Sequence, residues 1–202
     1  MRRLLLWRGL DAWRAEAACV ELTDRGTRAT GTQLGVEPLP YRLDYELDAS
    51  DGFVTGTLEV EAAGGGWTRS LRLQRDGGVW RCETGEEGEA ELPPAGGTVD
   101  GLGDALDCDL GFSPLTNMMP VRRHALHEQP GAVDFVMAWV SVPDLGLHAS
   151  RQRYEHVRRH EDGATVRFVD LGLFEGFTAE LEIDPDGLIR IYPGLARRVE
   201  GA

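Results

Sequence analysis

The sequence contains no lysine, although 21 of its 202 residues are basic, so every cationic side chain is an arginine. Because the guanidinium group is a planar fork with five donors, each of these cations is suited to a carboxylate or a phosphate. Acidic residues number 34, which gives a net charge of −13. A surface of this sign repels nucleic acid and anionic membranes, and this excludes the usual electrostatics of a nucleic-acid-binding protein.

Cysteine is scarce and apolar runs are short. Cys19, Cys82 and Cys108 are far apart and form no C-x-x-C pair, which excludes a disulfide framework and a zinc ribbon. The apolar run near the start of the chain is interrupted by Arg8 and Asp11, too early for a signal peptide or a membrane span. We therefore expect a cytoplasmic protein without a transmembrane segment.

Amphipathic helical periodicity is also missing, and the dominant period is two. Apolar and polar residues alternate through Tyr41–Asp48 and again through Phe177–Asp184, as in half-buried strands. Turn sequences such as Asp51-Gly52 and Asp184–Gly187 follow these runs. The sequence thus predicts an all-β protein made of antiparallel hairpins. The expected core residues on matching strands are Tyr45, Leu47, Leu181 and Ile183.

The hairpins occur twice in the same order. The segment Cys19–Gly35 resembles Tyr154–Gly172: each is a strand, a charged turn ending in glycine, and a strand ending in Leu-Gly. The turn glycines, Gly26 and Gly163, are separated by the same offset as Gly35 and Gly172. This order indicates a duplicated β-module rather than a chance match.

The duplication predicts one domain built of two similar β-subdomains, about 1–106 and 107–202. Residues of roughly 62–130 would connect the repeated strands. Two modules that pair their edges give one large curved antiparallel sheet or half-barrel around a hydrophobic groove.

The segment Asp107–Arg123 fits neither helix nor strand. Gly111, Pro114 and Pro120 break any helix, and two prolines this close cannot pair inside a sheet. The segment is nevertheless rich in apolar side chains. It therefore either packs as a crossover beneath the sheet or lines the groove.

Arginines and carboxylates supply the candidate polar groups. Arg151 and Arg153 fall on one face of a strand, and together with Arg122 they could grip a phosphate or carboxylate. Alternatively, the arginines pair with internal carboxylates such as Asp107 and Asp109. These two carboxylates share a strand face, so as a pair they could serve acid–base catalysis.

Other catalytic or metal-binding signatures find no support. The serines lie in no G-x-S-x-G elbow. The closely spaced histidines in His124–His127 and His156–His160 lack the H-E-x-x-H order. The sequence therefore predicts neither a bound metal nor a cofactor.

Several short segments, taken in order, resemble a group of bacterial proteins described as "putative glycolipid-binding proteins". The segments are Trp7–Asp11, Asp107–Arg123, Arg151–Tyr154, Gly176–Leu181, Asp186–Leu188, Tyr192–Leu195 and Arg197-Arg198. The resemblance covers nearly the whole chain. It implies two similar β-subdomains joined around a hydrophobic groove, and it implies lipid binding. It assigns no catalytic residue.

We therefore expect non-catalytic binding of a small amphiphile, a glycolipid on the family resemblance, in the groove. The alternatives are an enzyme that uses Asp107 and Asp109 on a lipid-like or sugar-containing molecule, and a structural module that binds a partner protein. The residues predicted to contact the apolar part of the ligand are Phe112, Leu115, Met118 and Met119. Those predicted to face the polar head are Asn117, Arg122, Arg151, Arg153 and Tyr154.

Overall fold

The computed structural model describes residues 1–200 and confirms the all-β prediction, with 57% of the chain in strands and 3% in helix. The first strands are β1 (Arg2–Gly9), β2 (Arg14–Leu22), β3 (Thr27–Gly35), β4 (Tyr41–Ala49), β5 (Thr57–Gly64), β6 (Trp67–Asp76) and β7 (Val79–Gly88). They are followed by β8 (Asp107–Leu110), α1 (Met118–Arg123), β9 (Ala132–Val140), β10 (Leu147–His160), β11 (Gly163–Asp170), β12 (Thr178–Ile183), β13 (Ile189–Tyr192) and β14 (Ala196–Arg198).

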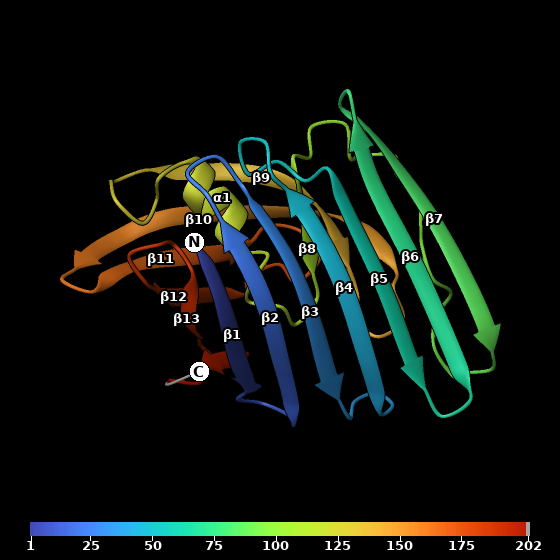
Figure 1. Cartoon of the computed structure of the whole chain (residues 1–202). Coiled ribbons are helices and arrows are strands. Elements are labelled where there is room, and N and C mark those ends of the chain that lie inside the picture. Colours follow the sequence, from blue (N-terminus) through green and yellow to red (C-terminus); the bar gives the residue numbers. More distant parts are fainter. Residues whose placement is uncertain (201–202) are drawn as a thin grey trace.

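All the strands described in residues 1–200 join in one open sheet. Its order is β7-β6-β5-β4-β3-β2-β1-β14-β13-β12-β11-β10-β9-β8, and Figure 1 shows the first seven strands side by side. Every neighbouring pair is antiparallel except β8 with β9, which is parallel. The sheet is not closed into a barrel, so β7 and β8 are its two edges, as the prediction of one large curved sheet requires.

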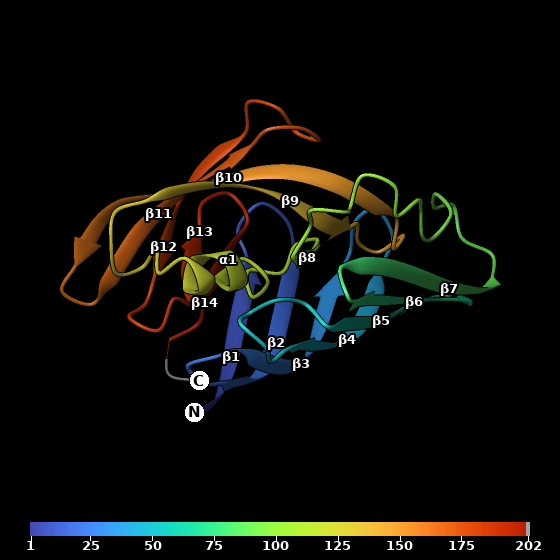
Figure 2. The same ribbon diagram turned by 90° about the horizontal axis from the view of Figure 1, so that it is seen from above.

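The sheet bends until its two halves face each other. Seen from above in Figure 2, strands β1–β6 form one layer and β9–β12 another, with α1 and β8 between them. The predicted core residues Tyr45, Leu47, Leu181 and Ile183 are all buried, which confirms their assignment. The burial follows from the alternation in β4 and β12, where every second side chain points inward.

The two halves of the sheet join at a narrow seam between β1 and β14. Three residue pairs form this seam, and in one of them Trp7 lies opposite Arg198. The Trp7 indole is buried, and its Nε1–H donates to the carbonyl oxygen of Ile189 at 2.9 Å. The Trp7 indole therefore helps to anchor the first strand to the second half of the molecule, as do the ion pairs of Arg3 with Asp184 and Asp186.

Two glycines of β3 let tyrosine rings lie flat on that strand. Tyr45 of β4 is opposite Gly31, and Tyr41 is opposite Gly35. A Cβ atom at either glycine would collide with the facing ring. The rings therefore cover the backbone of β3 and bring their hydroxyl groups toward β2.

The two predicted hairpin copies correspond in the sheet. β2 and β3 meet at a turn containing Gly26, and β10 and β11 meet at Gly163. A Cβ atom at Gly26 would collide with the carbonyl oxygen of Ala49, the last residue of β4; at Gly163 it would collide with that of Ile183, the last residue of β12. This shared contact supports the proposed duplication, which stays a prediction together with its boundaries at 106 and 107.

The predicted connection over residues 62–130 is wrong in its first part. β6 and β7 extend the first layer beyond the repeated hairpins instead of linking the halves. The linking segment begins after Gly88, and its residues Leu102 and Ala105 are buried. Strand alternation continues through Leu71 and Leu73, which the repeat pattern alone could not reveal.

The expectation that Pro120 would break any helix is also wrong. α1 begins at Met118, which makes Pro120 its third residue. A proline is tolerated there because the N–H groups of the first turn have no partner within the helix. Met118, Met119, Pro120 and Val121 are buried, so α1 is part of the core.

Candidate ligand-binding cavity

A cavity of about 460 Å³ lies between the second layer, the segment that follows β8, and the turn between β1 and β2. It is lined by Asp11, Asp109, Leu110, Gly111, Phe112, Ser113, Asn117, Trp139, Ser141, Val142, Ser150, Gln152, Phe168, Asp170, Phe174, Phe177, Tyr192, Gly194 and Leu195. Its wall is mainly apolar and aromatic, with a few polar groups, which is the usual character of a small-molecule site.

Two larger hollows have a different character. One of about 820 Å³ lies over the charged outer face of the first layer, where Glu46, Glu59 and Arg72 contribute to it. Another of about 1150 Å³ follows the β1–β14 seam and is lined by several arginines with acidic side chains among them. Neither hollow combines an apolar wall with buried polar groups, so we take the aromatic cavity as the candidate site.

Aromatic rings form one side of the cavity. Phe168 of β11 is 6.0 Å from both Phe177 and Tyr192, measured between ring centroids, and the last two rings are stacked at 6.4 Å. Trp139 of β9 meets Phe174 edge to face at 5.6 Å. Phe174 is 58% exposed and Phe177 44% exposed, so this aromatic wall continues out to the solvent.

The loop between β11 and β12 that carries Phe174 is held by Asp170. One oxygen of this buried carboxylate accepts hydrogen bonds from the backbone N–H groups of Gly172 and Phe174, both at 2.8 Å. The backbone N–H of Asp170 donates to the carbonyl oxygen of Phe177. The end of β11 therefore fixes the position of Phe174 and Phe177 at the opening of the cavity.

A hydrogen-bonded network around Asp109 forms the opposite side. Its Oδ2 accepts from Gln152 Nε2 at 2.8 Å, and its Oδ1 accepts from the Thr116 hydroxyl at 2.9 Å and from Asn117 Nδ2 at 3.5 Å. Burial raises the pKa of Asp109 to about 6, and the donors from Gln152 and Thr116 oppose that rise. Among residues 1–200 no cation forms an ion pair with this carboxylate.

This network fixes the orientation of the Asn117 side chain. Because Nδ2 donates to Asp109, the amide oxygen Oδ1 is the atom left to accept. Asn117 is 4% exposed, and Oδ1 has no hydrogen-bond partner in the described part of the chain. A buried acceptor on the cavity wall is therefore available to a donor group of a ligand.

Comparison with known proteins assigns the chain to a family. The sequence profile of the family described as "Putative glycolipid-binding" matches residues 4–198, nearly the whole chain. The chain belongs to this family. The crystal structure of a DUF1089 family protein from Pseudomonas aeruginosa at 1.80 Å resolution is similar, with a TM-score of 0.66 and 28% identity over 96% of this chain and 95% of that one. No curated protein matches the chain.

Of the ligand-binding residues predicted from the sequence of this family member, Phe112 and Asn117 line the cavity. Leu115, Met118 and Met119 do not line it; they are buried in the core cluster of the first layer. The two alternatives for the segment after β8 are therefore both realised: part of it lines the cavity, and part of it packs beneath the sheet.

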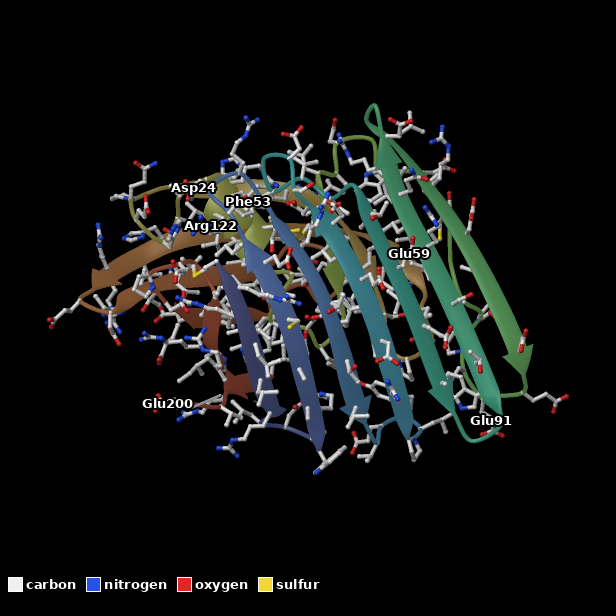
Figure 3. All side chains as sticks on the ribbon, viewed as in Figure 1. Asp24, Phe53, Glu59, Glu91, Arg122 and Glu200 are labelled. Atoms are coloured by element: carbon white, nitrogen blue, oxygen red, sulfur yellow. The ribbon has the colours of Figure 1, made fainter. Side chains whose placement is uncertain are left out.

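The predicted arginines lie elsewhere. Arg153 of β10 forms an ion pair with Asp134 on the outer face, with 2.6 Å between Nε and Oδ1, and Arg151 is exposed on the same face. Arg122 donates to the carbonyl oxygen of Asp186, and its guanidinium group covers the ring of Phe53. Arg122 and Phe53 are labelled in Figure 3. These three side chains are not part of the cavity lining.

The inward face of β10 carries Ser150 and Gln152, which the sequence analysis missed, and Tyr154, which it predicted to face the polar head of the ligand. Ser150, Gln152 and Tyr154 alternate with the exposed arginines and are buried. Ser150 and Gln152 line the cavity, while Tyr154 lies behind it and its hydroxyl donates to Gln152 Oε1 at 3.4 Å. The signal was present in the alternation itself, because buried polar residues two apart on a strand need partners.

Two further observations bear on the function. No group of three or more histidine, cysteine, aspartate or glutamate side chains in residues 1–200 is arranged to hold a metal ion. Within the same residues no helix has the length and apolar character needed to cross a bilayer.

Proposed function

We propose that this protein binds a small amphiphile without transforming it, and that a glycolipid-like molecule fits best. The apolar part lies among Phe168, Phe174 and Phe177, and the polar part meets Asn117 and the network around Asp109. Supporting this, the cavity volume is within the range of about 300–1,000 Å³ that is usual for small-molecule sites, and the family description names glycolipids.

The observation that carries the proposal is the buried amide oxygen of Asn117. A cavity meant only for hydrocarbon has no use for an oriented acceptor, because an unpaired buried polar atom destabilises the protein. A ligand hydroxyl supplies the missing donor, and the adjacent aromatic rings favour an apolar chain or the flat face of a sugar. A glycolipid contains both parts.

One observation favours a second candidate, an enzyme that acts on a similar amphiphile. The pKa of Asp109, raised by burial to about 6, suits a group that exchanges protons near neutral pH. Asp107 would not act with it, because Asp107 is engaged with Arg123. Turnover of a bound glycolipid, followed by mass spectrometry, would distinguish this enzyme from a carrier.

Displacement of a dansyl-labelled fatty acid by octyl glucoside tests the proposal. We expect Phe174→Asp to weaken binding of both probes at least tenfold, because a carboxylate at the mouth opposes entry of an apolar chain. The matched control is Val79→Asp on β7, since Val79 is 57% exposed, nearly as much as Phe174, and lies outside the cavity lining. Equal binding by the two variants, or none by the wild type, would refute the proposal.

A further inference from the structure

Three buried polar atoms meet at a second, much smaller cavity of about 10 Å³. They are Glu16 Oε2, Gln33 Oε1 and the hydroxyl of Tyr41, and none has a hydrogen-bond partner among residues 1–200. All three residues are buried and line this cavity. Buried polar atoms in native proteins are nearly always satisfied by protein, water or ligand, so three unpaired atoms at one place indicate a missing group.

The strands hold these side chains in fixed positions. Glu16 and Gln33 are opposite each other in the β2–β3 pair, and the Tyr41 ring lies against Gly35 of β3. The other oxygen of Glu16 accepts from Tyr45 at 2.6 Å and from Ser113 at 2.7 Å. The unpaired atoms of Glu16, Gln33 and Tyr41 thus belong to side chains that are held by hydrogen bonds or by packing against the backbone, so they cannot easily turn away from the cavity.

The chemistry of the three atoms fits one hydroxyl group. Gln33 Oε1 is an acceptor and Tyr41 offers a hydroxyl proton. Glu16 Oε1 accepts from Tyr45 and Ser113, and burial raises the pKa of Glu16 to about 7, so below that pH Oε2 carries the proton. One hydroxyl can then accept from Glu16 and Tyr41 and donate to Gln33. Burial raises the pKa of Tyr41 to about 12, so its proton remains available for donation. The volume suits one water-sized oxygen, which needs about 10–15 Å³. Arg14 also lines the cavity, and its charge opposes binding of a second cation.

The small cavity adjoins the aromatic one. Phe112 and Leu195 line both, so they form the wall between them. Phe112 has a φ of 61°, which is uncommon for a residue other than glycine, and its ring lies 4.0 Å below the guanidinium carbon of Arg14. Its neighbours are tied to the first layer, because Gly111 accepts from Gln33 and Ser113 donates to Glu16.

We propose that the small cavity is a subsite for a single hydroxyl group, supplied by water in the ligand-free protein and by the polar head of the ligand when the aromatic cavity is filled. The second half of this statement rests on the proposed function. The first half does not, because the unpaired atoms are present whatever the ligand is.

Thermal unfolding of Tyr41→Phe in the ligand-free protein tests the first half. If water pairs with the hydroxyl, its removal lowers the melting temperature by about 2–4 °C, as expected for loss of one buried hydrogen bond in a chain of this size. Tyr45→Phe, which loses a hydroxyl with a known partner, is the matched control. If Tyr41→Phe leaves the melting temperature unchanged or raises it, the hydroxyl is unsatisfied and the water site is refuted.

Affinity for two probes of equal chain length tests the second half. Tyr41→Phe should weaken octyl glucoside about tenfold relative to wild type and leave methyl octyl ether, which has no hydroxyl, unchanged. A lower melting temperature with unchanged octyl glucoside affinity would restrict the occupant to water and overturn the ligand half. If neither probe binds the wild type, the proposed function fails, whereas the melting temperatures still decide the water site.

Discussion

The guanidinium of Arg123 grips the carboxylate of Asp107 with two parallel contacts, 2.6 Å from Nη1 to Oδ1 and 2.5 Å from Nη2 to Oδ2. Nη1 also donates to the carbonyl oxygen of Phe53 at 3.0 Å. Asp107 begins β8 and Arg123 ends α1, so the pair closes the segment between them into a unit. That unit positions both the core residues of α1 and the cavity residues Phe112 and Asn117.

Removing one partner of this ion pair should strongly destabilise the folded protein. We expect Arg123→Met to lower the free energy of unfolding by about 3–5 kcal/mol, because it leaves a buried carboxylate without its cation. Urea unfolding measures this change. Arg153→Met, which breaks the half-exposed pair with Asp134, is the control and should cost far less stability, because solvent screens an ion pair this exposed. Similar losses in both variants would contradict the assigned role of Arg123.

Leu181 tests the packing of β12. It is fully buried, and we expect Leu181→Ala to destabilise the protein by about 2–5 kcal/mol through lost burial and the cavity that remains. Leu173→Ala in the exposed loop after β11 serves as the comparison and should change stability by less than about 0.5 kcal/mol. If Leu181→Ala melts within a degree of wild type, the inward orientation of β12 is wrong.

The pH dependence of stability should report on Glu16. Burial raises the pKa of Glu16 in the folded protein to about 7, above its usual value. At a pH between the pKa of Glu16 in the unfolded chain and its pKa in the folded protein, the folded state binds a proton that the unfolded state has lost. The stabilisation from Glu16 is therefore full at low pH, and it is lost as the pH rises toward 7. The loss is on the order of 3 kcal/mol.

Glu16→Gln isolates that contribution. The amide keeps an acceptor for Tyr45 and Ser113 and offers N–H donors near Gln33, and it cannot ionise. We expect the variant to be more stable than wild type at pH 8 and nearly equal at pH 5, measured by urea unfolding at each pH. A difference that does not depend on pH would show that Glu16 does not titrate in this range.

The two faces of β10 should contribute differently to binding. Gln152→Leu removes the donor to Asp109 on the cavity side, and we expect it to weaken octyl glucoside at least tenfold. Arg153→Ala acts on the outer face, and we expect a change of less than about twofold. The earlier hypothesis that Arg151 and Arg153 select the head group predicts the reverse order, so one displacement assay on both variants decides between them.

Alternation made much of the fold predictable. The pattern in Tyr41–Asp48 and Phe177–Asp184 identified strands and their inward residues, because a half-buried strand must alternate. It also placed Arg151 and Arg153 correctly on one face of a strand. It could not say which face of that strand meets the cavity, and a shift of one residue exchanges the two faces.

The site was less predictable because several distant segments form it. Phe174 and Phe177 come from the loop before β12 and Tyr192 from the end of β13, and only the folded sheet brings them to Phe112 and Asn117. Composition did indicate that the segment after β8 would be buried or line a cavity. Its short helix was missed because a proline was taken as a helix breaker without regard to its place in the first turn.

The two edges of the open sheet bear on whether molecules of this protein adhere to one another. β8 is buried along its whole length, so its edge is hidden from other molecules. β7 is exposed and carries Glu83 and Glu87 on one face, so a second copy that approached this edge would bring matching carboxylates. Carboxylates brought together at two paired strand edges repel each other. We therefore expect the acidic side chains of β7 to oppose edge-to-edge association between two molecules, and salt to screen that repulsion.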